Sequence, residues 1–277
     1  MKFLRINVFK ELEIKIMNII VLIKQVPATT DVKIDEKTGT LKREGVEAQV
    51  NPFDMYAVEE AVRLKEKYTG KVSVLTMGPP QADKALRECL AMGCDEAVLV
   101  SDREFAGSDT WATAYTLAQS IKKIGNYDMI LCGKQAIDGD TAQVGPGVAE
   151  MLDIPHIAYI KKIEKIENNK ITVERMMEDG YDLIESPTPC LITVVKEINN
   201  PRLPSLRGMM FSKKAEIKHF NAKTIEADKI KIGIAGSPTN VMKVFCPPAR
   251  TGGERIAGEP SEQASKLVSK LKELKTI

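Results

Sequence analysis

The chain has 277 residues, a formal net charge of +2 and only two histidines; 43% of its residues are hydrophobic and 28% are charged. This is the composition of an ordinary globular protein, long enough for one large domain or two small ones. The near balance of 40 basic and 38 acidic residues argues against nucleic acid or an anionic membrane as a partner, and 5% aromatic residues leave little for base stacking. No apolar run approaches the roughly 20 residues of a membrane span.

The chain begins with a charged segment, and its cysteines are scattered. Charges recur at nearly every third position of residues 1–16, which argues against a secretory signal, so we interpret 1–16 as a poorly ordered leader. An odd number of cysteines with no CxxC pair predicts buried, reduced thiols in a cytoplasmic protein, and the isolated histidines give no metal site. The cysteines are Cys89, Cys94, Cys132, Cys190 and Cys246.

Apolar runs alternate with amphipathic stretches through the first half of the chain. The apolar runs predict buried strands at 18–23, 72–77, 97–100 and 129–132. The amphipathic stretches predict helices at 54–67, 81–92, 110–124 and 141–152. This alternation predicts an α/β fold with a Rossmann-like, mostly parallel sheet and helices on both faces.

The rhythm changes in the second half of the chain. Strands are predicted at 157–166, 170–177, 181–186 and 190–195. The turns Asn168-Asn169 and Asp179-Gly180 between them predict an antiparallel hairpin extension of the sheet. Residues 229–277 are rich in proline and glycine and show a helical pattern only at 261–274. We therefore predict one domain at 17–228 and an extended C-terminal arm at 229–277 that lies over a partner or the main body.

The most informative local feature is the polar loop Gly133–Gly147. It follows a predicted strand and leads into a predicted helix, so it offers free N–H groups at the positive end of a helix dipole. Small residues would let a phosphate approach that backbone, whereas Asp138 and Asp140 would repel it and would instead cap the helix or hold the loop in shape. The loop is neither G-x-G-x-x-G nor a Walker A motif. A capped helix without a ligand is the competing interpretation.

Other polar segments also fall where predicted parallel strands end. These are Lys24-Gln25, Gly78-Pro79 and Val50–Asp54, in which Asn51 or Asp54 could equally cap the following helix. Ligands of open α/β sheets bind at the carboxyl ends of the strands, so the convergence of these loops favours a nucleotide site. No spacing indicates a Ser-His-Asp set or a pair of catalytic carboxylates.

At these residues the chain resembles the beta subunits of electron-transfer flavoproteins, from Met17 nearly to the C-terminus. The hairpin segment Val173–Thr193 resembles the family's signature, with Asp182 where the family favours Glu or Gln. The other matching segments are IKQV at 23–26, VNPFD at 50–54, TMGP at 76–79, LAMGCDEA at 90–97, GKQAID at 133–138, PRLPSLRGMM at 201–210 and PPARTGG at 247–253.

The resemblance implies a heterodimer with an alpha subunit that holds an electron-transferring FAD, and an adenine nucleotide in this chain. Leu206 matches the leucine that anchors an acyl-CoA dehydrogenase, and residues 229–277 would wrap the alpha subunit. The residues that match the family's cofactor contacts are Leu22, Asn51, Pro52, Phe53, Asp54, Met77, Gly133, Lys134, Gln135, Ala136, Ile137, Asp138, Gly139, Asp140, Thr141, Ala142, Gln143 and Val144.

The resemblance also bears on the subclass. GDTAQVGP at 139–146, together with GSDTWATA at 107–114, looks more like the anaerobic, electron-bifurcating group, in which the bound nucleotide is FAD and NADH is the electron donor. Electrons would then pass to ferredoxin or flavodoxin and to the dehydrogenase. Two alternatives stay open: a non-bifurcating carrier with AMP in this site, and a nucleotide-sensing stress-type module without a redox role.

Overall fold

The computed structural model describes residues 16–28, 47–242 and 252–277. Within these residues nine strands form one sheet in the order β11-β5-β4-β1-β6-β10-β7-β8-β9, parallel from β11 to β7 and antiparallel from β7 to β9. The parallel strands are β1 (Met17–Leu22), β4 (Gly70–Met77), β5 (Glu96–Val100), β6 (Met129–Gly133), β7 (His156–Glu167), β10 (Cys190–Val194) and β11 (Ile217–Phe220). The predicted α/β class and parallel sheet are confirmed.

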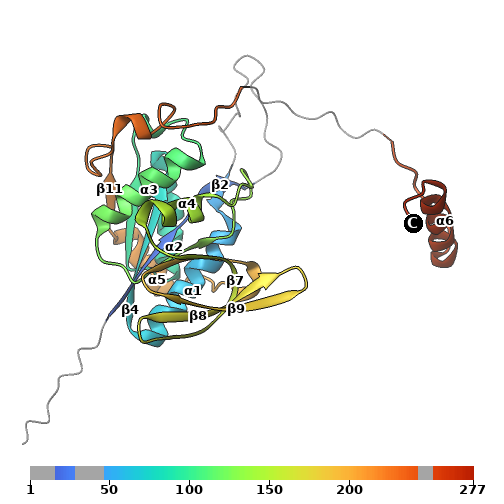
Figure 1. Cartoon of the computed structure of the whole chain (residues 1–277), viewed down its shortest axis with the longest axis horizontal. Coiled ribbons are helices and arrows are strands. Elements are labelled where there is room, and N and C mark those ends of the chain that lie inside the picture. Colours follow the sequence, from blue (N-terminus) through green and yellow to red (C-terminus); the bar gives the residue numbers. More distant parts are fainter. Residues whose placement is uncertain (1–15, 29–46, 243–251) are drawn as a thin grey trace, which may run out of the picture. The chain divides into compact units, whose positions relative to one another are not determined.

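Helices cover both faces of the sheet (Figure 1). Alternate residues of a strand point to opposite faces, and the apolar residues on both faces are packed against helices. Ile19 and Val21 of β1 pack in one apolar cluster with helix α1 (Pro52–Tyr68) and helix α2 (Asp83–Met92). Ile20 and Leu22 pack in a second cluster with α3 (Thr110–Ile124) and α4 (Val144–Leu152). Short 3-10 turns occur at Pro80–Ala82, Arg103–Phe105, Lys196–Ile198 and Lys229–Lys231.

The antiparallel extension predicted from the two turns is also confirmed. Strand β8 (Lys170–Met177) pairs with β7 and with β9 (Gly180–Pro187), and the three extend from the parallel part of the sheet as a twisted ribbon (Figure 1). A separate small sheet joins β2 (Gln25–Pro27) to β3 (Ala48–Val50) in antiparallel pairing. This small sheet was not predicted from the sequence.

Two further differences from the sequence predictions concern helices. Helix α4 begins at Val144 and not at 141. Asp140 and Ala142 have left-handed φ angles of 52° and 55°, which a right-handed helix cannot contain, so the helix starts only after them. No helix was predicted between the strand at 190–195 and the C-terminal arm, but the structure has one there, α5 (Leu206–Lys214), whose N-terminus is capped by the Ser205 hydroxyl accepting from Gly208 N.

The compact unit continues past residue 228, as far as Met242. Ile232 is 2% exposed and belongs to the cluster beneath α3. Asp109, the N-cap residue of α3, accepts hydrogen bonds from Thr239 N and Thr239 Oγ1, and its own N–H donates to Ser237 Oγ. The segment that follows Lys229 is therefore held by the main unit at several points.

The last described segment contains helix α6 (Pro260–Glu273), of which no residue is buried. Cys246 and the leader up to residue 15 lie outside the described residues, while the four described cysteines are buried and form no disulfide. Among the helices of the described ranges, none combines the length and the apolar character needed to cross a bilayer.

Candidate functional site

The strand order reverses between β1 and β6, and this is where the predicted site residues gather. The chain proceeds from β1 to β4 and β5 on one side and to β6 and β10 on the other. In open α/β sheets such a reversal opens a crevice at the carboxyl ends of the strands, where ligands bind. Leu22, Met77 and Gly133 stand at the carboxyl ends of β1, β4 and β6, and residues 51–54 start α1 at the same edge.

Asn51 braces the loop that follows β6. Its side chain is fully buried; Nδ2 donates to Gln135 O at 2.9 Å, and Oδ1 accepts from Ile137 N at 3.1 Å. Asn51 is the N-cap residue of α1, but its side chain makes no capping hydrogen bond. The amide therefore fixes the shape of a loop more than eighty residues away, and the capping interpretation is wrong for Asn51.

Asp54 joins the ends of the two strands that flank the reversal. Its Oδ2 accepts from Lys24 N at 2.8 Å, and its Oδ1 accepts from Gly133 N at 3.0 Å. Burial raises the pKa of this carboxyl group to about 7, although these two N–H groups, Asn51 and the Lys24 charge act in the opposite direction. Asp54 lies beneath the loop and is 5% exposed, so it supports the site from below.

The two loop aspartates that appeared unfavourable for an anion site have partners. Asp138 pairs with Lys24 Nζ at 2.7 Å, and Asp140 accepts a hydrogen bond from Gln135 Nε2. Neither side chain caps α4, which has no side-chain cap. The aspartates hold the loop in shape, and Lys24 partly offsets the charge of Asp138. Because no side chain caps α4, its start is open to an anion.

The middle of the loop at 133–147 is exposed to solvent. Ile137 to Thr141 and Gln143 are exposed, while Lys134, Gln135, Ala136, Ala142 and Val144 are half-buried. A Cβ atom built on Gly139 would meet no atom closer than Lys24 Nζ at 4.0 Å, so the space above it is open. The backbone from Gly139 to the first N–H groups of α4 can receive a phosphate, so this part of the loop fits the phosphate groups of a nucleotide.

Several of the predicted site residues have indirect roles, and some contacts of the loop were not predicted. The Leu22 side chain is buried in the core, so only its backbone is near the edge. Lys134 Nζ lies 5.0 Å from the Phe53 ring centroid. The ion pair of Lys24 with Asp138 and the hydrogen bond from the Thr110 hydroxyl to Gln143 Oε1 at 3.0 Å were not predicted, although the sequence had drawn attention to both segments, 24–25 and 107–114. Their positions, directly after β1 and at the start of α3, were the available signal.

We expect Asn51→Ala to destabilise the fold by about 1–3 kcal/mol, because Gln135 O and Ile137 N lose their buried partner. Urea unfolding of the protein measures this cost. The control is Gln143→Ala in the same loop, which removes only an exposed hydrogen bond and is expected to cost less than about 0.5 kcal/mol. Equal costs for the two variants would contradict the bracing role of Asn51.

Leu206 lies apart from this loop. It begins α5, its side chain is 78% exposed, and α5 packs against α2. The neighbouring Leu203 and Met210 are exposed as well. These three side chains form an apolar surface, which we call the α5 surface.

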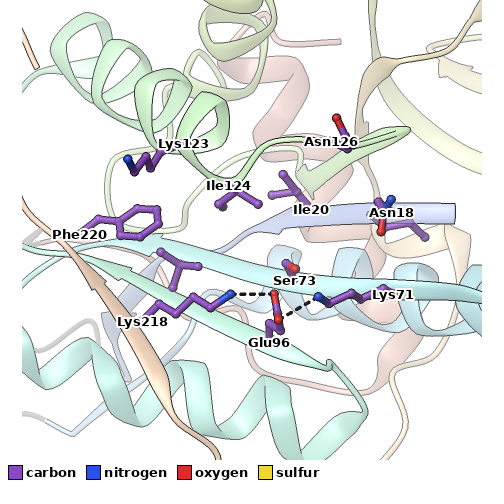
Figure 2. Close-up of a pocket in the computed structure, with 12 residues that line it drawn as sticks. Asn18, Ile20, Lys71, Ser73, Glu96, Lys123, Ile124, Asn126, Lys218 and Phe220 are labelled. Carbon is purple, nitrogen blue, oxygen red and sulfur yellow. Dashed lines mark hydrogen bonds and ion pairs between the residues drawn. The ribbon is translucent and has the colours of Figure 1, made fainter. Parts of the chain in front are cut away.

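A cavity of about 220 Å³ opens at the opposite, amino-terminal edge of the sheet (Figure 2). Glu96 on β5 pairs there with Lys71 at 2.8 Å and with Lys218 at 3.2 Å, so the charges of this cavity tie three neighbouring strands together. Among the described residues there is no cluster of His, Cys, Asp and Glu suited to a metal ion.

The sheet, its reversal and the braced loop define a Rossmann-like α/β protein with a candidate nucleotide site at the switch point. Residues 38–225 match the electron transfer flavoprotein domain family. This chain therefore belongs to the electron-transfer flavoprotein family, and within it to the beta subunits.

Relatives that match more than nine tenths of the chain support this assignment. The chain is 53% identical over 256 residues to the electron transfer flavoprotein subunit beta of Thermoanaerobacterium thermosaccharolyticum, covering 92% of this chain and 98% of that protein. It is 52% identical over 259 residues to the caffeyl-CoA reductase-Etf complex subunit CarD of Acetobacterium woodii, covering 93% and 98%. It is 46% identical over 264 residues to the acryloyl-CoA reductase electron transfer subunit gamma of Anaerotignum propionicum, covering 92% and 98%.

Proposed function

We propose that this chain is the beta subunit of a cytoplasmic, heterodimeric electron-transfer flavoprotein that binds FAD at the β1–β6 switch point. In this proposal NADH supplies two electrons, of which one goes to ferredoxin or flavodoxin. The other goes through the FAD of the alpha subunit to an acyl-CoA dehydrogenase. The observation that carries the nucleotide part is the braced loop that leads into the uncapped start of α4.

The residues of this chain bind and orient the cofactor. The N–H groups at the start of α4 would receive a phosphate, and Asn51 and Asp54 would hold the loop to the strands beneath it. When bound, the flavin supplies the hydride and single-electron chemistry, which agrees with the lack of a catalytic side-chain set in the sequence. The bifurcating subclass is supported by the relatives from CoA-ester reductase systems and by the sequence GDTAQVGP at 139–146.

The C-terminal helix supports the heterodimer. Leu267 and Leu271 lie four residues apart on one side of α6, Leu274 directly follows the helix, and no residue of α6 is buried. A helix of 14 residues is marginal in water without tertiary packing. We propose that the alpha subunit covers this apolar side.

Counting the cofactors tests the proposal. The chain is co-expressed with its alpha subunit, and the cofactors released by denaturation are quantified. Two FAD per heterodimer is the expected result. One FAD and one AMP would replace bifurcation with a simple electron carrier, and no flavin in an intact heterodimer would overturn the redox function in favour of a nucleotide-sensing module.

Leu206→Ala tests the α5 surface. Removing a leucine side chain that is buried on docking is expected to raise the KM for a purified short-chain acyl-CoA dehydrogenase about tenfold or more. Steady-state electron transfer with varied dehydrogenase measures this effect. The flavin content should stay at the wild-type level, because Leu206 lies away from the loop at 133–144. An unchanged KM would remove this leucine from the docking surface.

A further inference from the structure

The segment that leads into α5 is anchored on α1, the helix that begins at the nucleotide site. Asn199 Nδ2 donates to Tyr56 O and to Glu60 Oε2, each at 3.0 Å. The exposed Leu203 and Leu206 follow this anchored segment within a few residues. The path of the chain into the α5 surface is therefore set by contacts with α1.

Arg202 makes the strongest of these contacts. Its main-chain N–H donates to Glu59 Oε2 at 3.0 Å, and its Nε donates to the same oxygen at 2.9 Å. Its two terminal nitrogens donate to the two carboxylate oxygens of Glu66 at 2.6 and 3.0 Å. Glu59 and Glu66 lie seven residues apart on one side of α1, so the planar guanidinium spans two turns of the helix. We call these three residues the Arg202 clamp.

The clamp includes a buried charge. The Glu59 side chain is 2% exposed and also accepts from Arg63 Nε at 2.6 Å. Burial alone would raise the pKa of Glu59, but the hydrogen bonds from Arg202 and Arg63 outweigh it and hold the pKa below its ordinary value. Glu59 is thus ionised at neutral pH, and its carboxylate oxygens have hydrogen-bond partners. Such charge-assisted hydrogen bonds fix the relative positions of the two side chains.

The rest of α5 is fixed against α2. A Cβ atom on Gly208 would collide with Ala91 O, so the two helices approach each other closely at this glycine. Arg87 of α2 donates to Ser212 O at 2.5 Å and pairs with Asp83 at 2.8 Å. The helix is therefore held on its inner side while Leu206 and Met210 remain exposed.

We propose that Arg202 is a positioning residue for partner docking: by clamping the start of the α5 surface to Glu59 and Glu66, it holds Leu203, Leu206 and Met210 ready to receive the dehydrogenase. This inference rests on the proposed docking function of Leu206. A surface that is already ordered loses less conformational entropy on binding, so the clamp contributes affinity without itself contacting the partner.

The test uses the heterodimer with bound cofactors and two clamp variants, Arg202→Lys and Glu66→Gln. Lysine keeps the charge but cannot form the fork, and Glu66 is exposed, so neither change threatens folding. The matched control is Lys71→Gln, which breaks a 2.8 Å ion pair at the amino-terminal edge of the sheet while Glu96 keeps Lys218. The first readout is hydrogen exchange of the α5 amides without dehydrogenase, and the second is the kinetics with varied short-chain acyl-CoA dehydrogenase.

Both clamp variants should speed α5 exchange and raise the KM for the dehydrogenase. The factor expected for Arg202→Lys is about tenfold, as for one lost hydrogen bond to a charged group, and for Glu66→Gln about two- to fivefold, because Glu66 is exposed to solvent. The kcat and the flavin content should not change, and Lys71→Gln should match the wild type. Wild-type exchange or a wild-type KM in both clamp variants, with Leu206→Ala still impaired, would overturn the clamp and leave the docking function standing. A wild-type KM for Leu206→Ala would overturn docking at the α5 surface, and the inference with it.

Discussion

Gly133→Ala is expected to destabilise the protein by about 4 kcal/mol or more and to prevent retention of the nucleotide. A Cβ atom at this position would lie 2.5 Å from the carbonyl carbon of Phe53 and 2.6 Å from Asp54 Oδ1. The backbone at the start of α1 cannot move away without breaking the hydrogen bond from Gly133 N to Asp54. One methyl group would thus separate β6 from α1 at the centre of the candidate site.

Urea unfolding and the count of released cofactors measure these two effects. Gly139→Ala is the matched control for unfolding, since the same substitution in the same loop finds no atom closer than 4.0 Å. Its free energy of unfolding should lie within about 0.5 kcal/mol of the wild type. A Gly133→Ala protein as stable as Gly139→Ala would show that the close contact of β6 with α1 does not exist in solution.

Regular elements with strong local signals were predictable from the sequence. Helix α3 matches its predicted bounds because Asp109 caps its first turn and Gly125 follows its end. Strand β8 matches because a turn bounds it on each side. Helix α5 was missed because Pro204 and Gly208 are typical of a loop, and only the packing of Gly208 against α2 explains a glycine within this helix. That contact joins residues more than a hundred positions apart, which no local pattern contains.

The candidate site shows the same division. Its location follows from where strands end, so the loops at 51–54 and 133–144 could be placed at one edge of the sheet. The contacts of each side chain could not be predicted, because Asn51 and Asp54 bond to the loop after β6, which is 79–86 residues away along the chain, and Asp54 also bonds to Lys24, 30 residues away. Both side chains turn inward and support the loop, whereas the sequence equally favoured capping or direct contact with the cofactor.

Asp54 is expected to make the stability of the protein fall as the pH rises from about 4 to about 7. Burial raises its pKa from 3.8 to about 7, so in this window the native state keeps a proton that the unfolded chain has released. The unfolded state then gains stability relative to the native state with each increase in pH. The loss amounts to about 4 kcal/mol over the window, since each pKa unit corresponds to about 1.4 kcal/mol.

Asp54→Asn isolates this effect, because an amide keeps the shape and does not titrate. The free energy of unfolding, followed from pH 4 to pH 8, should lose most of its slope in the variant, whatever constant offset the amide introduces. The groups that face Asp54 are Lys24, Cys89 and Cys132, and burial raises the pKa of both thiols well beyond this window. Equal slopes in the wild type and the variant would show that Asp54 is already ionised at pH 4.

The ionisation of Asp54 should also change the affinity for the nucleotide. An ionised Asp54 lies beneath the loop that we propose receives a phosphate, and like charges repel. Nucleotide affinity in the wild type is therefore expected to fall as the pH rises through about 7 and to stay level in Asp54→Asn. The difference should persist at about 1 M salt, where a Debye length of about 3 Å screens exposed charges but not a buried carboxylate. A difference that disappears in salt would assign the pH dependence to surface charges.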